Sequence, residues 1–84
     1  MEPLTLESTV DQMLSADYKD RFQAEVKQLR IRLTKLRIMI NDWDNGVLDF
    51  TPTCPRSMYD EQIDAMEKYM DILIKRAELE GIYL

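Results

Sequence analysis

The stretch FQAEVKQLRIRLTKLRIMI, residues 22–40, decides the fold, because its apolar residues recur at alternating steps of four and three. Such spacing places them on one face of a helix and calls for a facing partner. A second stretch, from Tyr59 to Ala77, has the same rhythm. The two apolar stripes are Phe22, Val26, Leu29, Leu33, Leu36 and Ile40 in the first and Tyr59, Ile63, Met66, Met70, Leu73 and Ala77 in the second. The sequence therefore predicts two long helices that pack on each other.

The residues around these stripes predict where each helix begins and ends. Ser15 or Asp17 is suited to cap the first helix, and Gly46 tolerates the left-handed backbone that a helix end needs. Pro55 suits the first turn of the second helix, and Gly81 is a natural stop. Because a connector of about ten residues joins two helices of similar length, we expect them to pack antiparallel. The predicted segments form one domain, residues 1–84: a short N-terminal helix or arm at 1–16, a helix at 17–43, a connector at 44–54 and a helix at 55–80.

The predicted fold class is all-α, an antiparallel helical hairpin with a short N-terminal helix. Apolar residues make up 45% and charged residues 32% of the 84 residues, which is typical of a folded chain. Each long helix also carries a second apolar seam, which a two-helix contact leaves uncovered. These seams are Ala24, Ile31 and Ile38 on the first helix and Met58, Ala65, Tyr69, Ile72 and Leu79 on the second. We expect other copies of the chain to cover them in a homo-oligomeric helical bundle. The alternative is that the short N-terminal segment covers them.

The first predicted helix is basic within an acidic chain. Residues 18–40 hold seven Lys or Arg against Asp20 and Glu25, a local charge of +5, whereas the whole chain carries −5. This contrast favours a specific anionic ligand over general attraction to polyanions. Long DNA or RNA would be repelled by the net charge, so no long nucleic acid is expected as a partner. Binding of long nucleic acid would need one face of the protein to gather these cations.

One polar face of this helix has the chemistry to bind such a ligand. It reads Tyr18, Arg21, Glu25, Gln28, Arg32 and Lys35, at steps of three and four. Arg can hold a phosphate through two parallel N–H bonds, and an aromatic ring can stack on a base. Arg21 also lies near the helix N-terminus, where free N–H groups favour anions. The candidate ligand-binding residues are therefore Tyr18, Arg21, Arg32 and Lys35. The alternative is that this stripe is an ordinary solvated face.

The composition argues against catalysis. The chain has no histidine, only two glycines and a single cysteine, Cys54. No phosphate-binding glycine loop or metal-ligand cluster follows from these residues, so we expect no catalytic residue, no metal and no cofactor. The start, Met1 to Leu4, lacks the basic and apolar regions of a signal peptide, and no apolar run is long enough to span a membrane. We expect a protein of the reducing cytoplasm with no membrane partner.

Several motifs resemble small tailed-phage proteins built on a helical hairpin. The resemblance rests on Leu48-Asp49-Phe50-Thr51-Pro52-Thr53-Cys54-Pro55, on Gln62, Ala65-Met66, Tyr69, Ile72-Leu73, Arg76-Ala77 and Glu80-Gly81, and on Tyr18-Lys19-Asp20-Arg21. It covers about residues 17–82. The family it resembles is that of the anti-CBASS and anti-Thoeris proteins, which sequester cyclic-nucleotide immune signals.

The resemblance implies a non-enzymatic sponge acting in the host bacterial cytoplasm. Members of that family form compact oligomers, hexamers in the anti-CBASS branch. They hold cyclic di- or trinucleotides between protomers without cleaving them. The family's ligand contacts imply Tyr18, with either Arg32 or Lys35 as its basic partner. This chain departs from the family in its Arg30, Arg32 and Arg37, where charges are often mixed, so its ligand preference can differ.

A different function class remains open from the residues alone. The apolar seams could bind a helix of another protein, as a phage adaptor or assembly protein would. The methionines of the predicted helices suit such adaptable contacts. A sponge should gain thermal stability from a cyclic nucleotide, whereas an adaptor should not.

Overall fold

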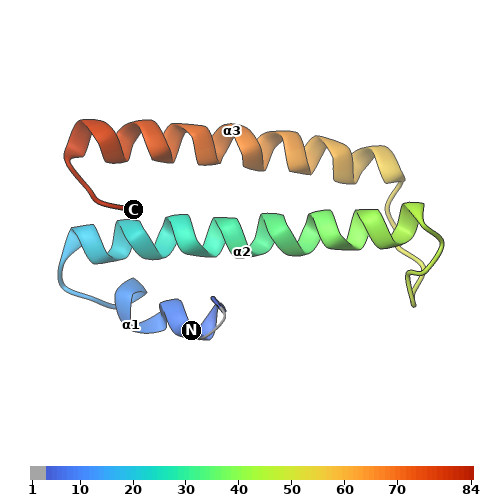
Figure 1. Ribbon diagram of the computed structural model, residues 1–84, viewed down its shortest axis with the longest axis horizontal. Helices are drawn as coiled ribbons and strands as arrows, with labels where there is room; N and C mark the ends of the chain where they lie inside the picture. Colours follow the sequence, from blue (N-terminus) through green and yellow to red (C-terminus); the bar gives the residue numbers. More distant parts are fainter. Residues whose placement is uncertain (1–3) are drawn as a thin grey trace.

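The protein is a hairpin of two long helices, and a short N-terminal helical segment packs along the N-terminal half of the first of them (Figure 1). The structure is a computed structural model and describes residues 4–84. A short 3-10 helix, η1 (Glu7–Thr9), leads into α1 (Val10–Met13), followed by the two long helices α2 (Tyr18–Asp44) and α3 (Arg56–Glu80). Within this described part, no residue lies in a β-strand, which confirms the predicted all-α class. Residues 1–3 of the predicted N-terminal arm lie outside the described residues.

Helix α2 begins and ends one residue later than the predicted 17–43. Its N-terminus is capped by Asp17, whose carboxylate accepts a 2.9 Å hydrogen bond from the backbone N–H of Lys19. At the other end, Gly46 has a φ of 72°, and the N–H of Val47 donates to the carbonyl of Asp42 at 2.9 Å. This turn is the helix ending that a glycine in the left-handed region permits. It reverses the chain into the connector.

Helix α3 begins at Arg56, with Pro55 as the preceding cap residue. The Arg56 guanidinium lies 3.0 Å from the Asp44 carboxylate, also pairs with Asp60, and lies 5.9 Å from the centre of the Trp43 ring. The hydrogen bond from Arg56 lowers the pKa of the Asp44 carboxyl group. These contacts tie the first turn of α3 to the last turn of α2, so that the two helices run antiparallel.

The apolar core lies between the two long helices, towards the α3 C-terminus. It consists of Phe22, Val26, Leu29, Leu73, Ala77 and Ile82, with Met66 and Met70 packed against it. Gly81, with a φ of 70°, turns the chain back so that the N–H of Ile82 donates to the Ala77 carbonyl at 2.8 Å. That reversal buries Ile82 in the core.

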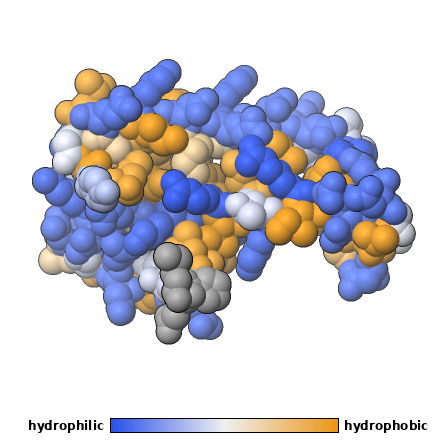
Figure 2. Space-filling view, viewed as in Figure 1, coloured by the Kyte–Doolittle hydropathy of each residue, from blue (hydrophilic) through white to orange (hydrophobic). Residues whose placement is uncertain are grey.

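The N-terminal segment covers part of the second seam of α2. Ala24 and Ile31 are 1% and 6% exposed, and the Gln28 amide donates to the hydroxyl of the buried Thr9 at 3.0 Å. Ile38 lines one hollow with Leu4 of that segment but stays 56% exposed. The N-terminal segment, which was the alternative to other copies of the chain, thus covers the seam residues Ala24 and Ile31. It leaves Ile38 and the seam of α3 exposed. Figure 2 shows hydrophobic surface in the groove between the long helices, crossed by hydrophilic side chains.

Candidate ligand-binding site

Two rows of side chains, one on each long helix, meet along one side of the hairpin. Each row repeats every seven residues: Tyr18, Glu25 and Arg32 on α2, and Gln62, Tyr69 and Arg76 on α3. Because the helices are antiparallel, the rows pair in reverse order, Tyr18 with Arg76, Glu25 with Tyr69 and Arg32 with Gln62. We call this side the Tyr18 flank.

At one end of the Tyr18 flank, Tyr18 belongs to a small polar network. Its hydroxyl donates to Glu80 at 2.8 Å and accepts from the Arg76 guanidinium at 2.9 Å. Arg76 also lies 5.1 Å from the centre of the Phe22 ring and 3.3 Å from Glu80. The hydrogen bond to Glu80 raises the pKa of Tyr18. Tyr18 is therefore held by α3, while 44% of its surface remains exposed to solvent.

In the middle of the flank, the Tyr69 hydroxyl donates to the Glu25 carboxylate. This hydrogen bond, with burial as a lesser cause, raises the pKa of Tyr69. The contact holds Glu25, the one acidic side chain of the row on α2, against α3. Among the described side chains, Arg32, the next residue of this row, forms no ion pair with Glu25.

At the other end of the flank, Arg32 and Lys35 line one groove of about 370 Å³. Its remaining walls are apolar side chains and one amide, from Leu6, Leu36, Met39, Gln62 and Met66. Neither cation forms an ion pair within residues 4–84. Two unpaired cations beside apolar surface can hold an anion that also carries a flat apolar group.

The structure does not bring all four candidate residues together in one copy. Arg21 donates to the Ser15 carbonyl at 2.8 Å, which places it at the turn before α2 and not in the groove. Tyr18 and Arg32 are 14 positions apart on one helix, or about 21 Å along its axis. Only Arg32 and Lys35 share a groove.

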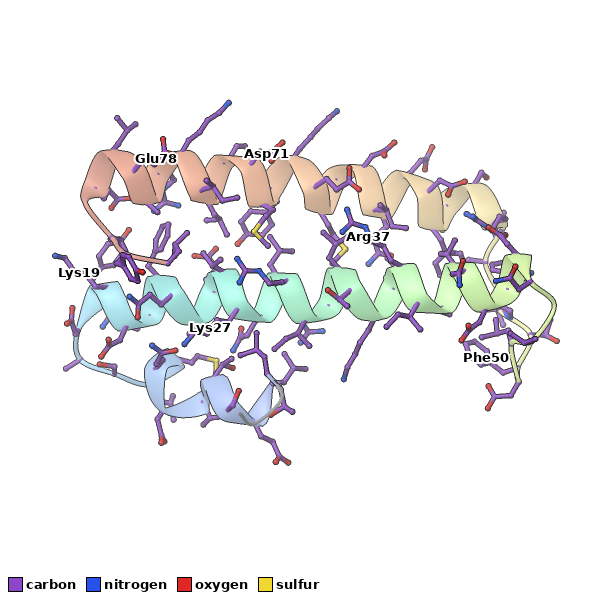
Figure 3. All side chains as sticks on the ribbon, viewed as in Figure 1. Lys19, Lys27, Arg37, Phe50, Asp71 and Glu78 are labelled. Atoms are coloured by element: carbon purple, nitrogen blue, oxygen red, sulfur yellow. The ribbon has the colours of Figure 1, made fainter. Side chains whose placement is uncertain are left out.

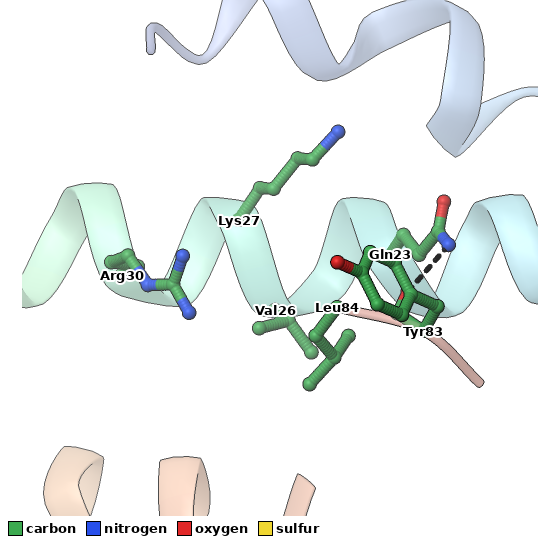
Figure 4. Close-up of a pocket in the computed structure, with 6 residues that line it drawn as sticks. All are labelled: Gln23, Val26, Lys27, Arg30, Tyr83 and Leu84. Carbon is green, nitrogen blue, oxygen red and sulfur yellow. Dashed lines mark hydrogen bonds between the residues drawn. The ribbon is translucent and has the colours of Figure 1, made fainter. Parts of the chain in front are cut away.

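The opposite side of the hairpin, which we call the Arg30 flank, also carries cations. Arg37 points towards α3 in Figure 3 and lies 2.5 Å from Glu67, and both line a groove of about 410 Å³ with Arg30. A smaller hollow of about 220 Å³ lies between α2 and the C-terminal tail (Figure 4), where the Gln23 amide donates to the Tyr83 carbonyl at 2.8 Å. No sequence prediction concerned these hollows.

Sequence reasoning missed the contribution of α3 to the Tyr18 flank. From the sequence, Gln62 and Arg76 belong only to the resemblance, and Tyr69 belongs to the resemblance and to an apolar seam. Their spacing of seven, equal to that of Tyr18, Glu25 and Arg32, is the signal that could have found them. Arg76 in particular adds a third cation to this flank.

The two tyrosines of this flank make the stability of the folded protein fall as the pH rises in the alkaline range. Tyr18 and Tyr69 have raised pKa values in the folded protein, compared with about 10 in an unfolded chain. The stabilisation is present below pH 10 and is lost as the pH rises through the folded values. Urea unfolding should therefore show a steeper fall in stability above pH 10 for the natural chain than for the Tyr18→Phe/Tyr69→Phe variant. Parallel pH profiles would contradict these contacts.

Comparison with known proteins gives one family match. The model of the Sequestin family matches residues 16–79, a span that contains α2, the connector, most of α3 and all four candidate residues. No curated protein and no solved structure gives a significant match. Among residues 4–84, no helix has the length and apolar character needed to cross a membrane, and no three Cys, Asp or Glu side chains are placed to hold a metal ion.

Proposed function

This chain belongs to the Sequestin family, and from that membership we propose that it is a non-catalytic protein that sequesters cyclic oligonucleotide immune signals. The family's name denotes sequestration, and its match covers the hairpin. By holding cyclic di- or trinucleotides in the host bacterial cytoplasm, such a phage protein would block anti-phage signalling.

The groove with Arg32 and Lys35 is the observation that carries this proposal. The two cations would hold ligand phosphates, and Leu36 and Met39 would contact the flat face of a base. The Gln62 amide can donate to and accept from a base edge. Tyr18, at the other end of the flank, would stack on a second base, a contact worth about 1–3 kcal/mol.

The size of the groove supports a site shared between copies. A volume of about 370 Å³ is near the lower end of the range of about 300–1,000 Å³ for small-molecule pockets. Within one copy, Tyr18 and Arg32 lie about 21 Å apart along α2, so a tyrosine at this position would approach the groove only from a second copy. The proposal therefore includes a homo-oligomer, a hexamer by the family resemblance, in which two copies enclose each ligand.

Calorimetric titration tests this function. We expect the purified chain to bind at least one member of a panel of cyclic dinucleotides, cyclic trinucleotides and cyclic ADP-ribose isomers, with heat release and a rise in Tm. The matching linear dinucleotide is the control and should bind more weakly. Ligand recovered after denaturation should be chemically intact. Absence of binding to the whole panel would refute the function, and recovery of cleaved ligand would refute the non-catalytic part.

The exposed apolar seam of α3 favours a second candidate function, a phage adaptor or assembly protein that binds another helix. In that case no cyclic nucleotide would change the Tm of the chain. The same titration therefore separates the two candidates.

A further inference from the structure

A chain of three hydrogen bonds runs across α2 and reaches both terminal segments of the hairpin. The Lys27 ammonium donates to Oε1 of Gln12 at 2.6 Å, and the Gln12 amide nitrogen donates to Oε1 of Gln23 at 2.9 Å. The Gln23 amide nitrogen donates in turn to the backbone carbonyl of Tyr83, the dashed line in Figure 4. Because Gln12 lies in α1 and Tyr83 in the C-terminal tail, residues 82–84, these bonds join the two segments through α2. We call this chain of bonds the polar clasp.

The groups at the two ends of the polar clasp allow only one orientation of its amides. An ammonium group only donates hydrogen bonds, and a backbone carbonyl only accepts them. Lys27 therefore requires the Gln12 oxygen to face it, which turns the Gln12 nitrogen towards Gln23. Gln23 accepts with its oxygen, which leaves its nitrogen for the Tyr83 carbonyl. The bond at the Lys27 end thus sets the orientation of the amide that holds the tail.

The surroundings of the polar clasp strengthen this dependence. Lys27, Gln12 and Gln23 are all half-buried, and hydrogen bonds that follow one another in such surroundings polarise and strengthen each other. The tail that they hold buries Ile82 in the core, where its backbone N–H donates to the Ala77 carbonyl at 2.8 Å. The N-terminal segment packs on the side of α2 that faces away from α3 (Figure 1). Contacts on that side therefore support the burial of Ile82 on the other.

We propose that the polar clasp couples the docking of the C-terminal tail on the core to the docking of the N-terminal segment on α2, with Gln12, Gln23 and Lys27 as positioning residues. The N-terminal segment also has a second anchor, the hydrogen bond from the Gln28 amide to the buried Thr9 hydroxyl. Among residues 4–84, the Gln28 side chain forms hydrogen bonds only with that segment. The two anchors therefore allow coupling through the clasp to be separated from general loosening of the segment.

The polar clasp also bears on the groove with Arg32 and Lys35, because the N-terminal segment supplies Leu6 to the wall of that groove. The Leu6 carbonyl accepts from the Thr9 hydroxyl at 2.6 Å, and Thr9 directly precedes α1, which carries Gln12. A segment held at Gln12 thus keeps Leu6 against the groove. This part of the inference rests on the proposed function, whereas the coupling of the two segments does not.

Amide hydrogen exchange of the full chain, followed by NMR, tests the coupling. Exchange of the Ile82 N–H reports opening of the tail. Exchange of the Thr9 N–H, which donates to the Leu6 carbonyl at 3.1 Å, reports opening of the N-terminal segment. Gln12→Leu removes the middle of the clasp but leaves the residue that contacts the tail. It should speed exchange at Ile82 about 3–10-fold, the effect of losing about one hydrogen bond.

Gln12→Glu tests the direction of the polar clasp. A carboxylate has nearly the same shape as the amide and keeps the bond from Lys27, but it cannot donate to Gln23. Exchange at Ile82 should therefore rise about 3–10-fold, as in Gln12→Leu, while exchange at Thr9 stays within about 2-fold of the natural chain. Unchanged exchange at Ile82 in Gln12→Glu would show that no orientation passes along the clasp.

Gln28→Leu is the matched control, because it makes the same side-chain change at the other anchor of the same segment. It should speed exchange at Thr9 and leave exchange at Ile82 within about 2-fold, since the segment stays docked most of the time and the clasp is intact. Circular dichroism of each variant establishes that the long helices remain folded. The coupling is overturned if Gln12→Leu leaves exchange at Ile82 unchanged, or if Gln28→Leu speeds it equally.

Calorimetric titration with the cyclic nucleotide that the natural chain binds separates the inference from the proposed function. Gln12→Leu should weaken binding at least about 3-fold through Leu6, although Gln12 does not line the groove, whereas Gln12→Glu should weaken it less than that. If Gln12→Leu loosens the tail but binds as the natural chain does, the role of Leu6 is wrong, and both the coupling and the function stand. If the natural chain binds no cyclic nucleotide, the proposed function fails, and the exchange rates still decide the coupling.

Discussion

The Leu73→Ala variant is expected to lose about 2–5 kcal/mol of unfolding free energy, enough to leave a large fraction unfolded at room temperature. Leu73 is 0% exposed at the centre of the core, and Leu73 and Ala77 are the two buried residues of α3. Removing its side chain leaves a cavity where α3 has little other buried contact with α2. Domains of this size have few kcal/mol to spare.

Urea unfolding followed by circular dichroism measures this loss. Leu14→Ala is the matched control, because Leu14 is 74% exposed, and its change should stay within about 0.5 kcal/mol. A Leu73→Ala variant as stable as the control would mean that the hairpin is not held by this core.

Replacing both Arg32 and Lys35 by alanine should abolish ligand binding while the fold remains. Both side chains are exposed and unpaired within the described residues, so their removal leaves no buried group unsatisfied. If each makes one charged hydrogen bond to a phosphate, worth about 1.5–3 kcal/mol, the pair accounts for at least about 100-fold in affinity. Calorimetric titration with the nucleotide that the natural chain binds measures the loss.

The control for this variant removes two cations from the other side of the same helix. Arg30→Ala/Arg37→Ala lies on the Arg30 flank and should leave affinity within about 3-fold of the natural value. Equal losses in both double variants would indicate general electrostatic attraction instead of a defined site. Normal binding in Arg32→Ala/Lys35→Ala would refute the site while leaving the function open.

The sequence alone predicted the helices well, because helix formation is signalled by residues close together in the chain. The stripe from Phe22 to Ile40 gave α2 within one residue at each end. Gly46 and Gly81 marked turns that the structure confirms as left-handed. For the site, the same periodicity placed Arg32 and Lys35 on one face, and they do line one groove.

Contacts between the helices were decided only by the tertiary structure. The pairing of Tyr18 with Arg76 and of Glu25 with Tyr69 depends on the register between α2 and α3, which the core and the Arg56 contacts fix. No local pattern encodes a register between residues more than 40 positions apart. Likewise, periodicity could not tell which apolar seam the N-terminal segment would cover, because Ile31 and Ile38 share one pattern and differ only in what packs above them.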